Sequence, residues 1–174
     1  MKRIFMFVLV TLFCVCVPSI AHAGETISYT NYGGCTLITK RASHWLAGKW
    51  TSYGLAKDGI EILPPCCEVW YDDALRILTF RQYIDHVSHK YRFFMYSADS
   101  GKLLYKGEFR AASSGNYEPY ITFENKGKYR NAVVNYYIDH RQGCGKKTIG
   151  NFFRQNGKLY QVQEKQMKVE APVD

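Results

Sequence analysis

Several sequence signatures of catalytic and metal-binding proteins are missing from this chain of 174 residues. Its six cysteines include no C-x-x-C pair, the spacing on which many zinc and dithiol redox sites are built. Ser113 and Ser114 lie outside any G-x-S-x-G frame, which argues against a serine hydrolase. Residues 143–148 end like a phosphate-binding loop, but His140 stands where that loop needs its first glycine. These absences favour a protein that binds over one that catalyses.

The N-terminus carries the longest apolar run and is typical of a secretory signal. Lys2 and Arg3 precede the apolar residues 4–17, and Ala21 and Ala23 occupy the A-x-A positions. The run is too short to span a bilayer comfortably, so a retained anchor is the weaker alternative. No N-x-S/T sequon occurs, which fits a bacterial source. We therefore predict that residues 1–23 are removed and that the protein is periplasmic or secreted, with no transmembrane segment in the mature chain.

The mature chain is predicted to be basic. Cleavage removes Lys2 and Arg3 but no acidic residue, so the formal net charge falls from +8 to +6. The remaining positive residues are spread along the chain and form no basic tail. Outward lysine and arginine residues on strands are typical of solvated sheets that resist pairing with one another. The alternative is attraction to an anionic partner; we expect an acidic protein and no nucleic acid.

Four cysteines remain after the predicted cleavage: Cys35, Cys66, Cys67 and Cys144. An even number in an exported chain predicts disulfide bonds, and four cysteines allow three pairings. A bond between the neighbours Cys66 and Cys67 would have poor geometry. We therefore expect one of them to pair with Cys35 and the other with Cys144, with the choice left open. A metal site or a vicinal redox pair is less favoured, because no C-x-x-C spacing is present.

Alternation of apolar and polar residues predicts antiparallel strands through most of the chain. Residues 90–96 place Tyr91, Phe93 and Met95 on one face of a strand, and residues 102–110 place Leu103, Tyr105 and Phe109 inward. Asn156-Gly157 between two alternating runs is the strongest hairpin signal. Pro64 and Pro65 end a strand, because proline cannot donate to a ladder. The predicted order is a meander of about eight strands.

One short N-terminal helix is also predicted. Apolar residues of the segment 35–47 fall near one helical face, and Gly48 stands where a helix would end. The strands most easily close on themselves, because closure removes exposed edges. We therefore predict a mainly β fold: a single closed β-barrel over residues 24–163, followed by a polar tail over 164–174. An open, curved sheet wrapped on the helix is the alternative.

Three short segments resemble lipocalin and avidin-like (calycin) barrels. Gly48-Lys49-Trp50 resembles the family's G-x-W opening, and Val133 to Tyr137 is similar to its later T-D-Y-type segment, without the Thr-Asp pair. Arg154 lies roughly where the family has an arginine. The resemblance implies that Trp50 packs across the closed end of the barrel with Arg154 over it. The family's helix after the last strand is missing from residues 164–174.

The resemblance implies a non-catalytic protein that holds an apolar or amphipathic small molecule without a cofactor. Inward residues would line the ligand cavity of such a barrel, or equally fill a solid core. The candidate ligand-binding residues are Trp50, Tyr91, Phe93, Met95, Tyr105, Phe109 and Tyr136.

A second function class is a protein-interaction module, such as a periplasmic inhibitor or immunity-type protein. Arg141, Lys146 and Lys147 lie near two glycines that free backbone amides, so they are the best candidates for an acidic partner or other anion.

A third hypothesis starts from a repeat, since Tyr-Ile-Asp-His occurs at residues 83–86 and again at 137–140. His86, His89 and His140, with Asp85 or Asp139, are low-ranked candidates for a metal site or a general base. We favour aspartates that cap turns beside solvated histidines, and predict no metal.

Overall fold

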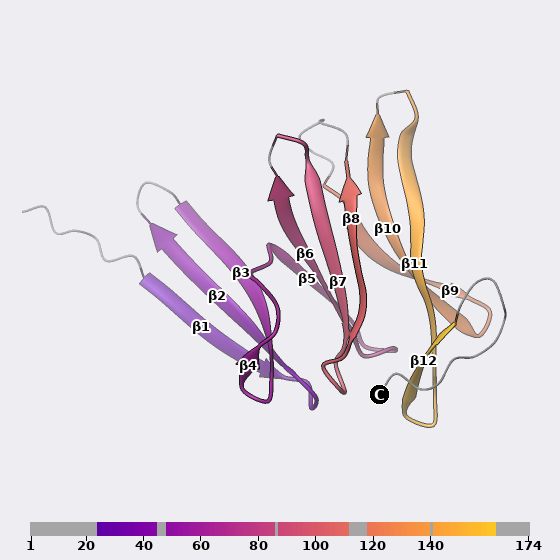
Figure 1. Cartoon of the computed structure of the whole chain (residues 1–174), viewed down its shortest axis with the longest axis horizontal. Coiled ribbons are helices and arrows are strands. Elements are labelled where there is room, and N and C mark those ends of the chain that lie inside the picture. Colours follow the sequence, from indigo (N-terminus) through magenta and orange to yellow (C-terminus); the bar gives the residue numbers. More distant parts are fainter. Residues whose placement is uncertain (1–23, 45–47, 86, 112–117, 140, 163–174) are drawn as a thin grey trace, which may run out of the picture.

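Twelve strands make up the described part of the computed structural model, which covers residues 24–44, 48–85, 87–111, 118–139 and 141–162. They form three antiparallel four-stranded sheets that stand side by side in chain order (Figure 1). In each sheet, strands adjacent in sequence pair with one another. No helix that could cross a bilayer occurs in these ranges. The prediction of a mainly β, antiparallel fold is therefore confirmed, but the described residues form twelve strands in three sheets instead of one meander of about eight strands.

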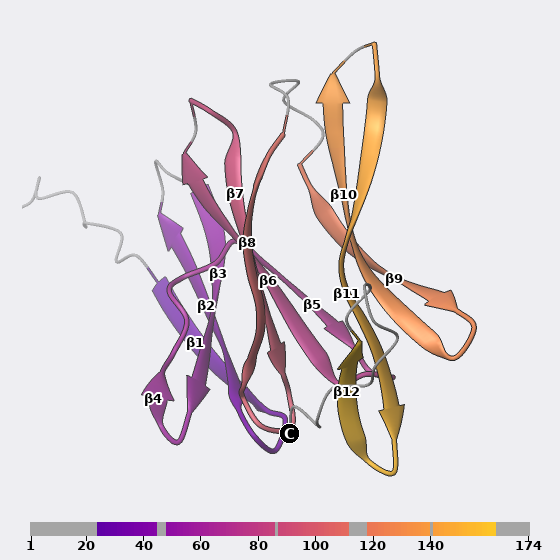
Figure 2. The ribbon, with the colours of Figure 1, turned by 45° about the vertical axis from the view of Figure 1, so that its right-hand side comes forward.

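The first sheet contains β1 (Gly24–Asn31), β2 (Thr36–His44), β3 (Gly48–Lys57) and β4 (Ile60–Glu61). The middle sheet contains β5 (Glu68–Asp72), β6 (Ile77–Asp85), β7 (Lys90–Ser97) and β8 (Leu103–Arg110). The last sheet contains β9 (Tyr120–Lys126), β10 (Tyr129–Asp139), β11 (Gly143–Gln155) and β12 (Lys158–Val162). The last sheet is strongly twisted (Figure 2), as expected of long antiparallel strands.

Two hydrophobic cores hold the three sheets together. The first core lies between the first and middle sheets and includes Leu37, Leu55, Leu78, Phe80, Phe94 and Tyr96. The second core lies between the middle and last sheets and includes Ile77, Phe93, Met95, Phe109, Val134 and Phe152. The middle sheet is therefore buried on both faces. This explains why apolar residues occupy both odd and even positions of β7. A strand with one solvated face would carry apolar residues at alternate positions only.

The predicted closed barrel is wrong for the described residues, where each sheet has two open edges. Prolines stand at both joints between sheets: Pro64 and Pro65 lie between β4 and β5, and Pro119 lies before β9. Because proline has no backbone N–H, it cannot continue a ladder at these points. The chain therefore starts a new sheet at each joint, and the sheets hide their faces by stacking rather than by closing.

The predicted N-terminal helix is wrong over residues 36–44, which form β2. This strand pairs with β1 on one side and β3 on the other along its whole length. Leu37 faces the first core, while Ile38 is buried on the opposite face. Apolar residues on both faces of the strand produced a spacing that resembled a helical face. Trp45 and Leu46, which contributed to that prediction, lie outside the described residues.

The predicted hairpin at Asn156-Gly157 is confirmed between β11 and β12. The φ angles are 52° at Asn156 and 76° at Gly157, the left-handed pair that a two-residue hairpin turn needs. The inward position of Leu103 is wrong, since this side chain is 45% exposed. A register shift between Met95 and Tyr96 turns Leu104 toward the second core instead.

Arg154 and Trp50 lie in different parts of the fold. Arg154 donates to the carbonyl of Leu75 at 3.2 Å and pairs with Asp99 at 2.6 Å, so it ties the last sheet to the middle one. Burial acts to raise the pKa of Asp99, but hydrogen bonds from Arg76 and Arg154 outweigh it and hold the pKa below its ordinary value. Trp50 is 49% exposed on the first sheet. The Trp50–Arg154 contact implied by the resemblance is therefore not formed.

Candidate functional site

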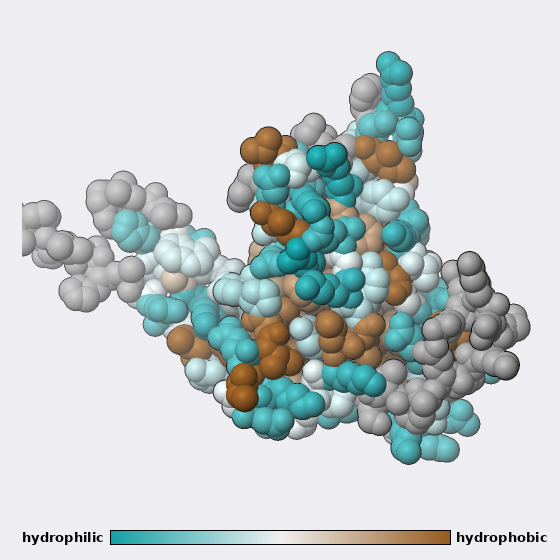
Figure 3. Space-filling view, in the orientation of Figure 1, coloured by the Kyte–Doolittle hydropathy of each residue, from teal (hydrophilic) through white to brown (hydrophobic). Residues whose placement is uncertain are grey.

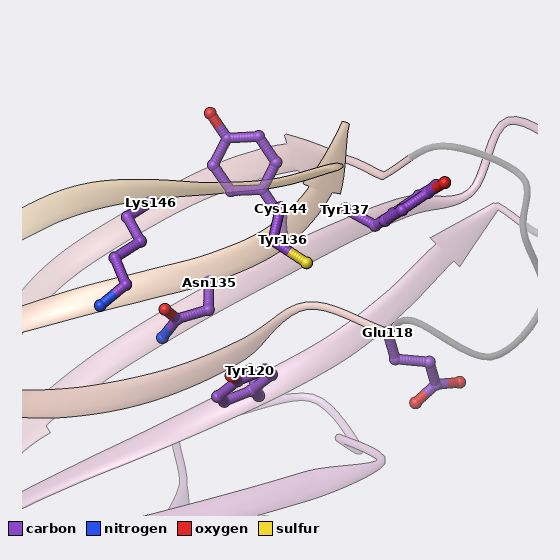
Figure 4. Close-up of a pocket in the computed structure, with 7 residues that line it drawn as sticks. All are labelled: Glu118, Tyr120, Asn135, Tyr136, Tyr137, Cys144 and Lys146. Atoms are coloured by element: carbon purple, nitrogen blue, oxygen red, sulfur yellow. The ribbon is translucent and has the colours of Figure 1, made fainter. Parts of the chain in front are cut away.

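A groove of about 290 Å³ lies on the last sheet, at the end where β10 turns into β11 (Figure 4). Its lining comes from three neighbouring strands and from the segment that enters β9. The lining residues are Glu118, Tyr120, Asn135, Tyr136, Tyr137, Cys144 and Lys146.

Strand register brings the groove residues together. Asn135 of β10 pairs with Tyr120 of β9 on one side and with Lys146 of β11 on the other, so the three form one row. Tyr137 pairs with Cys144 one step further along the same face. The alternate residues, such as Ile121 and Val134, face the second core. The groove thus lies mainly on the outer face of the last sheet, which points away from the middle sheet.

Tyr136 borders the groove but belongs to the opposite face of the last sheet, where its ring packs against the second core beside Gly145. A Cβ atom on Gly145 would lie 3.0 Å from the ring carbon that bears the Tyr136 hydroxyl and 2.9 Å from a methyl carbon of Ile138. Any larger residue at position 145 would therefore push the Tyr136 ring aside. The glycine lets an aromatic side chain cover the backbone of β11 at this point.

Charges of both signs lie along the groove. Lys146 donates to Glu124 at 2.7 Å, and this hydrogen bond raises the pKa of the lysine. Asn135 is only 7% exposed, and its amide donates to the hydroxyl of Thr122 at 2.8 Å. Glu118 contacts the guanidinium of Arg81 at the other end. The groove therefore offers aromatic rings, an amide and a balanced pair of charges, a combination that suits an amphipathic molecule.

A second hollow, of about 600 Å³, lies beside the β6–β7 turn and is lined by Asp85, Ser88, Lys90, Glu108, Phe109 and Arg110. Its charges already satisfy one another, since Lys90 and Arg92 both pair with Glu108. Hydrogen bonds from Lys90 and then Arg92 lower the pKa of Glu108 to about 2. This wide, polar hollow offers few apolar contacts, so we regard the groove as the better candidate.

Most of the predicted ligand-binding residues form core instead of a cavity. Tyr91, Phe93, Met95 and Phe109 are buried in the second core, with exposures of 4%, 0%, 0% and 7%. Tyr105 and Tyr136 pack against the same core. Phe93 and Phe109 meet edge to face with their ring centroids 5.5 Å apart. These side chains fill the space between two sheets, and only Tyr136 also lines the groove.

The predicted anion-binding residues do not form one site. Lys146 lies on the outer face and is paired with Glu124, whereas the ammonium of Lys147 lies 5.3 Å from the centroid of the Phe109 ring on the second-core side. Adjacent residues of a strand point to opposite faces, which explains the separation. Arg141 is exposed in the β10–β11 turn.

The repeated Tyr-Ile-Asp-His segments occupy equivalent places, since each ends the second strand of its sheet. The Asp85 carboxylate accepts from Val87 N at 2.9 Å, and that of Asp139 accepts from Arg141 N and Gln142 N at 2.7 Å. The predicted turn-capping role of both aspartates is confirmed. His86 and His140 lie outside the described residues, while His89 is in the β6–β7 turn. No group of metal-ligating side chains is found within the described ranges.

All four cysteines predicted to form disulfides are free thiols in this structure. Cys35 and Cys66 are buried, and Cys67 and Cys144 are exposed. Cys35 adjoins the β2–β3 pairing, whereas Cys66 pairs with Tyr53 from the opposite side of β3. Burial, and then the nearby Asp99, raises the pKa of Cys35 to about 11. Burial, and then Cys67, raises the pKa of Cys66 to about 12.

We expect brief alkylation at pH 8, on protein purified without reductant, to label Cys67 and Cys144 and to spare Cys35 and Cys66. A thiol with a pKa of about 11 is ionised to about one part in a thousand at this pH. Peptide mass spectrometry measures the labelling, and alkylation in denaturant, which should label all four cysteines, is the control. A disulfide-linked peptide containing Cys67 or Cys144 would contradict the free thiols and restore the predicted disulfides.

Of the groove residues, the sequence predicts Tyr136 as a ligand-binding residue inside a barrel, Cys144 as a disulfide partner and Lys146 as an anion-binding residue. Tyr120, Asn135 and Tyr137 were missed, although they alternate with core-facing residues of β9 and β10. Two tyrosines at outward positions of neighbouring strands were the available signal. Comparisons with protein-family models, with curated proteins and with solved structures return no match for this chain.

Proposed function

We propose that this is an exported, non-catalytic binding protein, and that the groove on the last sheet holds an amphipathic small molecule. The single observation that carries the proposal is that two outward-facing tyrosines, Tyr120 and Tyr137, lie with the buried amide of Asn135 along one hollow of about 290 Å³. That volume is near the lower end of known ligand pockets, so the ligand is small.

The groove suggests the chemistry of the ligand. Tyrosine rings give a large apolar contact at little conformational cost and carry a polar hydroxyl at their tip. Tyr120 is 51% exposed, so a flat ring or a short apolar chain can reach it without moving the backbone. Lys146 supplies a positive charge at the rim. We therefore infer a ligand with one apolar part and one anionic or hydrogen-bonding group.

The fluorescent probe 8-anilinonaphthalene-1-sulfonate tests this proposal, because it combines aromatic rings with an anionic sulfonate. We expect Tyr120→Ala and Tyr137→Ala each to weaken its binding by about ten-fold, the loss of about 1.4 kcal/mol of ring contact. Lys146→Ala should weaken the sulfonate contact and reduce the salt dependence of binding. Fluorescence titration measures all three variants.

Ile60→Ala is the control, because Ile60 is 69% exposed on β4 of the first sheet, away from the groove. Equal binding by the groove variants and the control, or no binding by the parent protein, would refute the proposed site. If the groove variants bind the probe more weakly than the control, native mass spectrometry of protein purified from its own cell envelope would identify the natural ligand.

An acidic protein partner is the second candidate function, and the predicted net charge of the mature chain favours it. Arg141 is the exposed basic residue of the β10–β11 turn, and Lys146 stands beside the groove. Charge reversal at Arg141 separates the two functions. It should leave binding of the probe unchanged, but should strongly weaken capture of an acidic protein at low salt.

A further inference from the structure

The edge strand β1 differs from the other edge strands of the three sheets. It runs for eight residues, and every one of them is exposed. Within the described residues it pairs with β2 on one side only, so its other side presents backbone N–H and C=O groups to solvent. Such an edge is a template for another strand.

The remaining edge strands carry the usual protection against pairing. β4 has only two residues. β12 has five residues, and all of them except Lys158 are at least partly buried. The other edges carry two or more charged side chains, which discourage edge-to-edge contact: Glu68 and Asp72 on β5, Lys106, Glu108 and Arg110 on β8, and Glu124 and Lys126 on β9. β1 has the sequence Gly-Glu-Thr-Ile-Ser-Tyr-Thr-Asn, with Glu25 as its one charged residue and no proline.

Exposed apolar side chains extend from this edge across one face of the first sheet. Ile27 and Tyr29 are 44% and 68% exposed, and Trp50 is 49% exposed. Ile27 pairs with Lys40 of β2, and Trp50 pairs with Ala42 two residues further along β2, so all of these positions share one face. The same sheet projects beyond the middle sheet (Figure 1), and its projecting part is mostly polar or neutral in the view of Figure 3. The apolar residues at β1 share the face of Ile38, opposite the face on which Leu37 meets the first core, so the middle sheet does not cover them.

We propose that β1 pairs with β1 of a second copy of this chain, antiparallel and around a two-fold axis, to join two first sheets into one of eight strands. In an antiparallel pair, the backbone N–H and C=O groups of two opposite residues both point toward the other strand or both point away from it. Because this direction alternates along a strand, two copies of β1 can only set odd-numbered residues opposite odd-numbered ones, and even opposite even. The two registers centred on β1 therefore place either Ile27 or Ser28 opposite its own copy.

Both registers are chemically self-compatible. In the first, Ile27 lies opposite Ile27 of the partner and Glu25 lies opposite Tyr29 of the partner subunit. In the second, Ile27 lies opposite Tyr29 of the partner subunit and Glu25 opposite Asn31 of the partner subunit. Neither register sets two like charges against each other, which would be destabilising. A two-fold contact of this kind uses the same patch on both subunits and closes, so it forms a dimer and no fibre.

The contact is small. One pair of eight-residue strands, with the side chains beside them, covers less than the roughly 1,600 Å² of a standard stable interface. We therefore expect a dimer in equilibrium with its monomer, and we expect the dimer fraction to rise with protein concentration. The proposed seam lies on the first sheet and the groove on the last sheet, so a test of the dimer and a test of the groove have independent outcomes.

Sedimentation equilibrium over a range of protein concentrations tests the dimer. We expect reversible dimerisation by the parent protein, and a dissociation constant at least about ten-fold higher for Ile27→Lys, which sets two lysines near each other at the seam. Ile60→Lys, on β4 at the opposite edge of the same sheet, should leave the constant unchanged. A parent protein that is monomeric at all concentrations, or a dimer that Ile27→Lys does not weaken, would overturn the proposal.

Cross-linking distinguishes this seam from any other dimer contact. Directly opposite residues of antiparallel strands have Cα atoms about 4.5–5.5 Å apart, within the reach of a disulfide. We expect either Ile27→Cys or Ser28→Cys, according to the register, to form a reducible dimer under mild oxidation. Ile60→Cys and the parent protein, whose Cys67 and Cys144 are exposed, are the controls. Dimers that form equally in the controls, or in neither β1 variant, would overturn the inference.

Discussion

Phe80→Ala and Phe93→Ala are each expected to lower the free energy of unfolding by about 3–5 kcal/mol. Both side chains are 0% exposed, but they lie on opposite faces of the middle sheet, Phe80 in the first core and Phe93 in the second. Each truncation removes apolar contacts and leaves a cavity that close-packed neighbours fill only in part. Because small domains are stable by about 5–15 kcal/mol, each variant should retain only a thin margin.

Equilibrium unfolding in urea measures the loss, and Leu103→Ala is the matched control. Leu103 is 45% exposed on β8 of the same sheet, so its truncation should cost less than about 1 kcal/mol. The pair of phenylalanines also separates the observed stack of sheets from a closed barrel. In a barrel, one face of this strand pair would face solvent, and Phe80→Ala would be nearly neutral. A neutral Phe80→Ala beside a costly Phe93→Ala would therefore contradict the three-sheet arrangement.

Strand positions and local turns followed from the sequence because they depend on near neighbours. The alternation around Tyr91 and Phe93 fixed β7, and Asn156-Gly157 fixed a hairpin whose backbone needs two positive φ angles. β4 ends at Glu61, shortly before Pro64-Pro65, where the sequence predicts the end of a strand. What alternation alone does not give is the number of layers that cover a sheet. Phe94 and Tyr96, on the face opposite Phe93, were the signal that the middle sheet is covered twice.

The grouping of strands into sheets depends on long-range packing, and this is where the prediction failed. A continuous meander favours closure only if its ladder is unbroken, and the prolines at positions 64, 65 and 119 interrupt it at both joints. The groove was missed for a related reason. Its residues come from β9, β10 and β11, and only the register between these strands sets Tyr120, Asn135 and Lys146 in one row.

Arg81 is a buried charge that the alternation of apolar and polar residues did not predict. It lies on β6 at the same parity as Ile77, so it faces the second core, and its side chain is 3% exposed. Its guanidinium donates to the carbonyl of Pro119 at 2.6 Å, pairs with Glu68 at 3.1 Å and contacts Glu118. A charged residue at a core-facing position of an apolar strand was the available signal.

Two aromatic rings enclose the same guanidinium. The ring centroids of Trp70 and Tyr91 lie 5.8 Å and 5.3 Å from its central carbon. Burial, and then the nearby Glu118, raises the pKa of Tyr91 to about 12, so its phenol stays neutral beside the ion pairs. Arg81 therefore fastens the segment that enters β9 to the centre of the middle sheet.

Arg81→Ala is expected to lower the free energy of unfolding by about 2–4 kcal/mol. Loss of one partner of a buried ion pair costs about 3–5 kcal/mol, but Glu68 and Glu118 are 46% and 55% exposed, so water can solvate them when the arginine is gone. Arg81→Lys should recover less than half of the loss, because an ammonium cannot make the forked contacts or stack on the rings as a guanidinium does.

The sharper test is the double replacement of Glu68 and Glu118 by alanine, measured by urea unfolding. Each single replacement leaves Arg81 with one carboxylate, whereas the double variant leaves a buried cation with no carboxylate and with the Pro119 carbonyl, Cys67 and the two rings as its remaining neighbours. Its loss should therefore exceed the sum of the two single losses by about 1 kcal/mol or more. Arg92→Ala is the control, since this partly exposed arginine pairs with Glu108 at the surface and should cost under about 1 kcal/mol. Losses at Glu68 and Glu118 that are both small and additive would show that Arg81 is held by packing against Trp70 and Tyr91, and that the carboxylates contribute little to the joint between the middle and last sheets.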